Sequence, residues 1–228
     1  MPSPTSAWVG SAQAVFMKDW RCELRSRYAL NAIGLFAVTT LVVTSAALGP
    51  AGTNKSLAIN VLPAMLWLIL LFAAAAGLPR AFVHEEESHT AIALRLASPP
   101  SALFVGKLVF GVTLLLAIEA LIAPLYLAVM SLEVSSPGLL VVALVSGGYG
   151  LAAGSVLIAA LASQARGKST LFSVLAFPVL MPLLLLAIEL TRNAVAGDVA
   201  GPALPQLLLY DGSVTIAGLM LFPAVWNP

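Results

Sequence analysis

Six long apolar stretches constrain this sequence more than any other feature. They cover residues 28–48, 57–78, 103–132, 139–162, 170–190 and 204–226, and the first, second and fourth carry no charged residue. About 20 apolar residues are enough to cross the hydrocarbon core of a bilayer as a helix. The sequence therefore predicts an all-α, polytopic membrane protein with six transmembrane helices in a single domain over residues 1–228.

Composition excludes several classes of protein. Of the 228 residues, 60% are hydrophobic and 9% are charged, so no length remains for a sizeable soluble domain. The net charge of +1 provides no field for binding nucleic acid. Cys22 is the only cysteine, which excludes a disulfide framework and a cysteine metal cluster. We expect a non-catalytic membrane subunit that binds no metal.

The cations predict an orientation, because lysine and arginine are retained on the cytoplasmic side of short loops. With six spans, nine of the eleven cations fall on one side, and only Lys55 and Arg192 fall on the other. Both termini are therefore expected to be cytoplasmic. The nine are Lys18, Arg21, Arg25, Arg27, Arg80, Arg95, Lys107, Arg166 and Lys168.

The segment 1–27 precedes the first span and has no continuous apolar stretch of the secretory-signal kind. At about 100° per residue, Phe16, Trp20 and Leu24 share one helical face, and basic residues gather on the other. We expect an amphipathic helix in the membrane interface, with its apolar face in the acyl boundary and its cations at anionic headgroups. A plain solvated lead-in to the first span is the alternative.

Residues 79–102 form the one long loop on the predicted cytoplasmic side. An acidic run is followed by apolar residues and then by Pro99 and Pro100, where a short amphipathic helix should end. Such a helix is a candidate docking surface for a cytoplasmic partner, although a membrane-surface helix without a partner has the same composition. The candidate coupling residues are Glu85, Glu86, Glu87, Ile92, Leu94, Arg95 and Leu96.

Two acids fall at membrane depth, Glu119 in the third span and Asp211 in the sixth. A charge at the bilayer centre costs at least ~2.5–3.5 kcal/mol on insertion scales. We expect no cation inside a span to pair with them, so they are candidates for a substrate path or a gate. Hydrogen bonds between helices are the alternative. Glu189 lies three residues before Arg192, and a local ion pair accounts for it.

Prolines and glycines inside the spans mark further candidates. A proline within a helix removes a backbone hydrogen bond and bends the chain, so Pro124, Pro178 and Pro182 join the candidate path; Pro63 should bend the second span. Small residues on one stripe of the fourth span let another backbone approach closely, here within the same chain. The predicted packing residues are Gly147, Gly150 and Gly154, with Gly148 beside them.

Two short motifs resemble catalytic signatures and lack an essential residue. Arg166 to Thr170 ends like a phosphate-binding loop, but Ala162 replaces the first glycine and a transmembrane helix precedes it. His84 and His89 flank three glutamates, but they are five residues apart, and a zinc protease helix needs four. Neither motif predicts a nucleotide or metal site.

Ten short segments follow one another along about 200 residues of the chain. They are 23–27 (ELRSR), 62–67 (LPAMLW), 80–82 (RAF), 94–99, 106–108 (GKL), 119–124, 172–178 (FSVLAFP), 182–184 (PLL), 208–211 (LLYD) and 221–223 (LFP). In their order and spacing these segments resemble the CcmB, or haem exporter protein B, family. Members of this family are the membrane subunit of the ABC-type complex of cytochrome c maturation.

The resemblance implies a bacterial plasma-membrane permease with the six-span fold of ABC-2 type transporters. It implies four partners: a CcmA-like ATPase, CcmC-like and CcmD-like membrane proteins, and a CcmE-like periplasmic haem chaperone. ATP would be hydrolysed on the CcmA-like partner, and haem would be the handled ligand. Haem export and release of haem-loaded chaperone both fit this role. The tryptophan-rich haem motif of that system belongs to a partner, so haem ligation by this chain is not implied.

Three other functions remain open on the residues alone. The chain would serve as an ABC-2 type exporter subunit for another substrate, as a proton-coupled secondary transporter using Glu119 and Asp211, or as a scaffold that transports nothing. No internal repeat pairs the two halves of the sequence, which counts against the secondary transporter.

Overall fold

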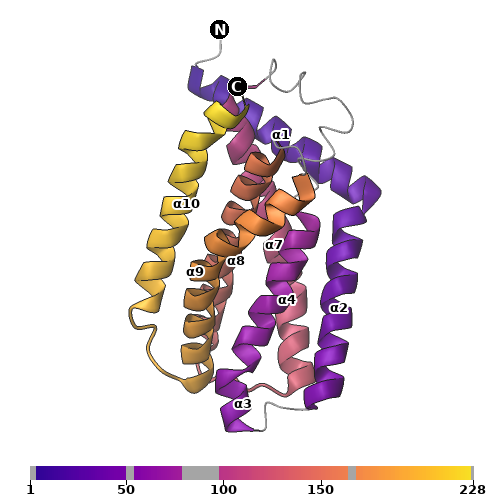
Figure 1. The fold of residues 1–228 in the computed structure, drawn as a ribbon, viewed down its shortest axis with the longest axis vertical. Coiled ribbons are helices and arrows are strands. Elements are labelled where there is room, and N and C mark those ends of the chain that lie inside the picture. Colours follow the sequence, from indigo (N-terminus) through magenta and orange to yellow (C-terminus); the bar gives the residue numbers. More distant parts are fainter. Residues whose placement is uncertain (1–3, 50–53, 79–97, 164–167, 227–228) are drawn as a thin grey trace.

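The computed structural model describes residues 4–49, 54–78, 98–163 and 168–226, and this part of the chain is helical with no strand. The helices form one elongated bundle (Figure 1). Long apolar segments fold in this way because every backbone N–H and C=O bonds within its own helix. The helices are α1 (Pro4–Ser26), α2 (Tyr28–Leu48), α3 (Lys55–Asn60), α4 (Leu62–Gly77), α7 (Pro100–Met130), α8 (Pro137–Ser163), α9 (Lys168–Ala196) and α10 (Ala203–Trp226).

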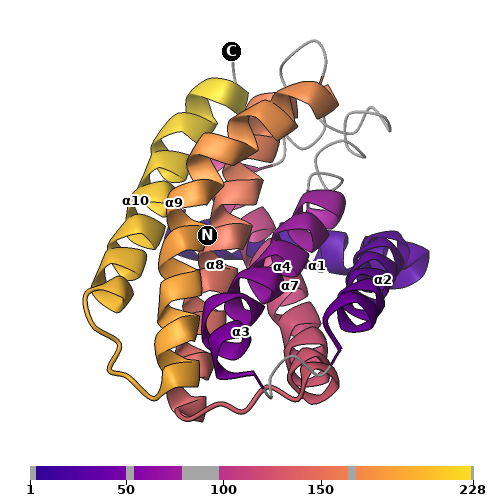
Figure 2. The same ribbon diagram turned by 60° about the horizontal axis from the view of Figure 1, so that its bottom comes forward.

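Helix α8 lies at the centre of the bundle, where it packs against α7, α9 and α10 (Figures 1 and 2). Helix α2 packs mainly on α4 at one edge, and α10 forms the opposite edge. Helix α1 runs across one end of the bundle, and α10 ends at that same end (Figure 1). The chain therefore begins and ends on one side of the bundle.

Five helical stretches of the described residues are long and apolar enough to cross a membrane. Helix α2 adds a shorter apolar stretch among the described residues, Gly34–Leu48, within a helix of 21 residues. The all-α, multi-pass architecture predicted from the apolar stretches is confirmed. The five stretches are Lys55–Ala75, Pro100–Met130, Pro137–Ala162, Leu175–Ala196 and Ala203–Ala224.

The second predicted span consists of two helical pieces. Helix α3 ends at Asn60, a turn follows at Val61, and Pro63 lies in the first turn of α4. A proline is tolerated there because the N–H that it lacks would have no partner in a first turn. Val61 keeps helical dihedral angles, and its N–H still bonds to the Leu57 carbonyl at 3.0 Å, so the span continues through a local distortion beside the proline.

The ends of two other helices differ from the expected bounds. Helix α7 begins at Pro100, with Pro99 as its extended N-cap, so the double proline starts this helix. Helix α9 continues past the apolar stretch to Ala196 and stops before Gly197, which has a φ of 84°. A glycine in this left-handed conformation is a common helix terminator.

Hydrogen bonds between distant helices hold the bundle together away from α1. The Trp67 indole N–H of α4 donates to the Thr191 hydroxyl of α9 at 2.8 Å, and both side chains are buried. The Tyr126 hydroxyl of α7 donates to the Leu62 carbonyl at 2.9 Å. In a membrane these bonds fix how the helices are placed, because lipid offers no competing partner.

Candidate functional site

The candidate site is built around four glycines of α8, each in contact with a side chain from another helix. An added Cβ would lie 2.1 Å from Trp67 at Gly147, 2.5 Å from the Glu119 carboxyl at Gly148 and 2.2 Å from the Asp211 carboxyl at Gly150. At Gly154 it would lie 2.5 Å from Leu180 of α9. These spacings leave no room for any larger residue. The glycines of α8 therefore receive side chains from α4, α7, α9 and α10.

Glu119 projects from α7 onto the backbone of α8. Its side chain is only 2% exposed, and neither carboxyl oxygen has a hydrogen-bond partner among the described residues. The three atoms nearest to a Cβ at Gly148 all belong to the Glu119 carboxyl. The glycine thus provides the space that this carboxyl fills.

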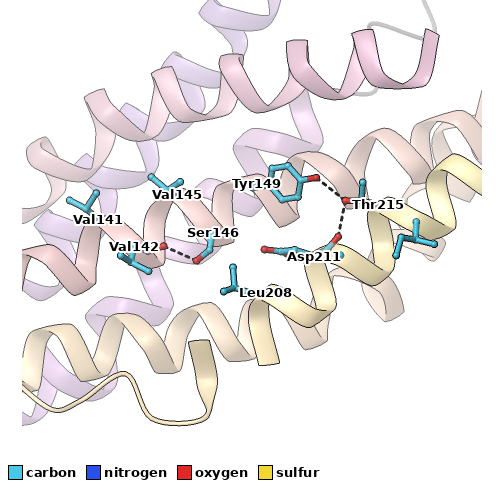
Figure 3. Close-up of a pocket in the computed structure, with 10 residues that line it drawn as sticks. Val141, Val142, Val145, Ser146, Tyr149, Leu208, Asp211 and Thr215 are labelled. Atoms are coloured by element: carbon cyan, nitrogen blue, oxygen red, sulfur yellow. Dashed lines mark hydrogen bonds between the residues drawn. The ribbon is translucent and has the colours of Figure 1, made fainter. Parts of the chain in front are cut away.

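Asp211 occupies the equivalent position from α10. It is 4% exposed, and both of its carboxyl oxygens also lack a partner within the described part of the chain. One turn further along α10, the Thr215 hydroxyl donates to the Asp211 backbone carbonyl at 2.7 Å. The same hydroxyl pairs with the Tyr149 hydroxyl of α8 at 2.9 Å, which places two hydroxyl groups beside the acid (Figure 3).

The two acids lie on opposite sides of α8. Gly148 and Gly150 are two residues apart, so about 200° of rotation around the helix axis separates the faces that they offer. The sequence grouped Glu119 and Asp211 as one candidate path. The structure brings each of them to α8, but the backbone of that helix stands between them.

A groove between α8 and α10 opens beside Asp211. Its volume is about 670 Å³, within the range of small-molecule sites. Val145, Leu208 and Ile216 form an exposed apolar rim. Ser146, Tyr149 and Thr215 supply the hydroxyl groups (Figure 3). The Ser146 hydroxyl donates to the Val142 carbonyl of its own helix. Asp211 is thus the one ionisable carboxyl among the lining residues.

The three prolines of the candidate path are exposed and line no part of this groove. Pro124 lies within α7, and Pro178 and Pro182 lie within α9. The backbone carbonyl of Val179, between the two prolines of α9, accepts a hydrogen bond from the Tyr210 hydroxyl of α10. A proline disturbs the helical bonding of the preceding turn, and Tyr210 supplies an external donor at that place.

Helix α1 is fixed to α7 by a buried ion pair. The Lys107 ammonium, 1% exposed, lies 3.5 Å from the carboxylate of Asp19, which is 7% exposed. Lys18 contacts the same carboxylate at 2.8 Å. Lys107 does lie inside α7, but its partner is Asp19 of α1, and neither Glu119 nor Asp211 has a cation as partner among the described residues.

Close packing accompanies the ion pair along the α1–α7 seam. A Cβ added at Gly106 would lie 2.7 Å from the Ala12 carbonyl oxygen, so the two backbones nearly touch. The Trp8 indole donates to the Ser101 hydroxyl at 2.9 Å, and Trp20 packs edge-on against Phe110. The apolar face of α1, which was expected to lie in lipid, thus packs largely against α7.

A comparison with protein-family profiles matches residues 11–225 to CcmB, described as CcmB protein. The match covers almost the whole chain. The chain belongs to the CcmB family. A search of curated proteins finds no match.

Membership in the CcmB family confirms the resemblance seen in the sequence. It implies a membrane component of the haem exporter system, which serves cytochrome c biogenesis, and association with other components of that system. Together with the apolar helices, it makes this CcmB family member a multi-pass membrane protein. A non-catalytic role as a permease subunit is consistent with the family.

Several predicted residues of this CcmB family member lie outside the described residues. They fall in residues 79–97 and 164–167. Within the described part, no cluster of three or more histidine, cysteine, aspartate or glutamate side chains is placed to hold a metal. The residues outside are Glu85, Glu86, Glu87, Ile92, Leu94, Arg95, Leu96, His84, His89, Arg166 and Gly167.

Sequence reasoning missed two features of this CcmB family member. The Tyr149–Thr215 pair lies beside Asp211, and no pattern in the sequence pairs residues from α8 and α10. The role of Asp19 could have been predicted from its position in the sequence. It follows Ala12 and Val15 at the i, i+3, i+7 spacing of one helical face, and an acid on that face indicates a partner on the neighbouring helix.

Proposed function

We propose that this chain is the membrane permease subunit of an ABC-type complex that handles haem for cytochrome c maturation. ATP would be hydrolysed by a separate, CcmA-like subunit, and CcmC-like, CcmD-like and CcmE-like proteins would be the other partners. The observation that carries the proposal is the family match over residues 11–225. Export of haem and release of haem-loaded chaperone are both compatible with this role.

The architecture of the described residues supports the proposal. They form a bundle of apolar helices, which is the architecture expected of a membrane permease subunit. A chain of this kind needs a partner to supply ATP hydrolysis.

The proposal includes six membrane spans, an ABC-2 type arrangement and cytoplasmic termini in the bacterial inner membrane. Helix α2 has 21 residues, about 31 Å at 1.5 Å per residue, which is enough for the sixth crossing. The chain starts and ends at one end of the bundle, as an even number of crossings requires.

Labelling single cysteines at Ser3 and Asn227 with an impermeant maleimide, in a Cys22→Ser background, tests the orientation. Labelling of intact cells from outside would contradict it.

The loop 79–97 would transmit the ATPase cycle to the spans. We expect the triple substitution of Glu85, Glu86 and Glu87 to Lys to weaken co-purification with the ATPase and to lower its activity. The matched control is Glu133→Lys, since Glu133 is exposed in the link between α7 and α8, at the opposite end of the bundle from α1. Unchanged co-purification and ATPase rates in the triple variant would remove these acids from the coupling role.

A proton-coupled secondary transporter is the second candidate. The observation in its favour is that the carboxyls of Glu119 and Asp211 are both buried without partners among the described residues. Transport that collapses with an uncoupler yet survives ATP depletion would establish it. Dependence on ATP alone would reject it.

A scaffold that transports nothing, and an exporter of another substrate, make separate predictions. The scaffold requires that Glu119→Gln and Asp211→Asn leave cytochrome c maturation intact. Loss of maturation in a variant that still assembles with its partners would reject the scaffold. Normal maturation in cells that lack the chain would point to another substrate.

A further inference from the structure

The groove beside Asp211, between α8 and α10, faces the outside of the bundle and has features that the proposed function does not explain. Its walls are apolar, and its rim of Val145, Leu208 and Ile216 is exposed on the outside of the bundle. In a membrane that side meets acyl chains, which bring no hydrogen-bonding group. The carboxyl in the groove therefore gains nothing from the surrounding hydrocarbon.

The carboxyl of Asp211 distinguishes this groove from an ordinary apolar gap between helices. Asp211 lines the groove and is only 4% exposed, and its carboxyl has no hydrogen-bond partner within the described residues. No other lining residue is charged, and the three lining hydroxyl groups, of Ser146, Tyr149 and Thr215, bond to other atoms. A buried carboxyl without a donor is costly, and a donor brought by a ligand would remove that cost.

The neighbouring groups define the chemistry of such a ligand. The Tyr149 and Thr215 hydroxyls already bond to each other, so Asp211 is the strongest free acceptor in the groove. Gly212 leaves open space next to it, since a Cβ added there would meet no atom within 4 Å. The groove thus offers room for an apolar body and one acceptor for its head group.

We propose that the groove between α8 and α10 binds a single-chain amphiphile whose head group, an ammonium above all, donates hydrogen bonds to the Asp211 carboxyl. The apolar chain lies against Val145, Leu208 and Ile216. An ammonium also supplies the counter-charge that the lining residues lack. A carboxylate amphiphile of the same length is disfavoured, because its head would face Asp211 with like charge.

Photolabelling of the full chain in phosphatidylcholine nanodiscs tests this proposal. The probe is a dodecylamine with a diazirine in the middle of its chain, and peptide mass spectrometry locates the adducts. We expect adducts within 141–149 and 208–216, with unlabelled dodecylamine competing about tenfold better than dodecanoate. The ammonium group could come from a membrane aminolipid or from a free single-chain amine. If the groove accepts an aminolipid, adding phosphatidylethanolamine to the nanodisc should compete with the probe and reduce the labelling. If it accepts only the free amine, the labelling should stay unchanged.

Two variants keep the test decisive. Asp211→Asn should remove the preference for the amine, while Glu119→Gln, on the other side of α8, should retain it. Gly212→Leu should abolish labelling by filling the open space; Gly138→Leu is its control because a Cβ at Gly138 also meets nothing within 4 Å and Gly138 lies outside the groove. Equal competition by amine and carboxylate, or labelling that survives both Asp211→Asn and Gly212→Leu, would overturn the proposal.

Discussion

Replacement of Gly147 by alanine tests the close packing at the centre of the bundle. A Cβ at this position would lie 2.1 Å from the Trp67 ring, whereas carbon atoms in contact are ordinarily about 3.5–4.0 Å apart. The ring, or α8 itself, must therefore move by about 1.5 Å. Trp67 has little freedom to move, because it is fully buried and its indole N–H is bonded to Thr191.

The expected cost follows from two opposing terms. Overpacking a core costs about 1–3 kcal/mol, and replacing a helical glycine by alanine returns about 0.5–1 kcal/mol. At this clash we expect a net loss of about 2 kcal/mol, which lowers the thermal midpoint by about 4–8 °C for a chain of this length. The assay is thermal unfolding of the purified protein in one detergent, followed by intrinsic fluorescence.

The control and the rescue use the same helix and the same ring. Gly138→Ala, also in α8, meets nothing within 4 Å and should leave the midpoint within about 2 °C. Trp67→Phe shortens the ring that causes the clash, so the double variant should be more stable than the sum of the two single losses by about 0.5–3 kcal/mol. A Gly147→Ala midpoint within 1 °C of the parent, or strict additivity with Trp67→Phe, would refute the reasoning.

Three further predictions concern other buried polar groups. Asp19→Asn should destabilise by about 3 kcal/mol, because it leaves Lys107 buried in α7 without this carboxylate; Lys107→Met should cost less, since Asp19 keeps a second lysine. Thermal midpoints and protease sensitivity of α1 check this, and equal losses would contradict it. Tyr126→Phe should cost about 1 kcal/mol by deleting the hydroxyl that donates to the Leu62 carbonyl, and a midpoint equal to the parent's would show that the bond adds nothing. Glu119→Gln keeps the shape against α8 and removes a group that no described residue neutralises, so its midpoint should equal or exceed the parent's, and a fall of several degrees would reveal a charge partner.

Sequence patterns located the elements well and their ends less well. The apolar stretches found the long helices, because a span must be apolar over its whole length whatever its neighbours are. The start of α7 at Pro100 and the end of α9 at Ala196 lay outside the apolar stretches, because capping and turn geometry decide where a helix stops. The extent of the distortion at Val61 was likewise not predictable, since one proline either bends a helix or starts a new one.

The candidate site divides in the same way. The sequence singled out Glu119, Asp211 and the glycines of α8, because a charge or a small residue is conspicuous in an apolar segment. It left open what they contact. In the structure each acid lies on its own glycine, Glu119 on Gly148 and Asp211 on Gly150.

The sequence by itself determined that this chain lives in a bilayer as a helical bundle and that it resembles the CcmB family. Both properties follow from local facts, which are hydrophobic length and the order of short motifs. Only the tertiary structure decided that Glu119 and Asp211 lie on opposite sides of α8, and that Asp19 reaches Lys107 across 88 residues of chain. Such pairings depend on how helices rotate and pack against one another, and no periodicity within a single helix specifies its neighbour.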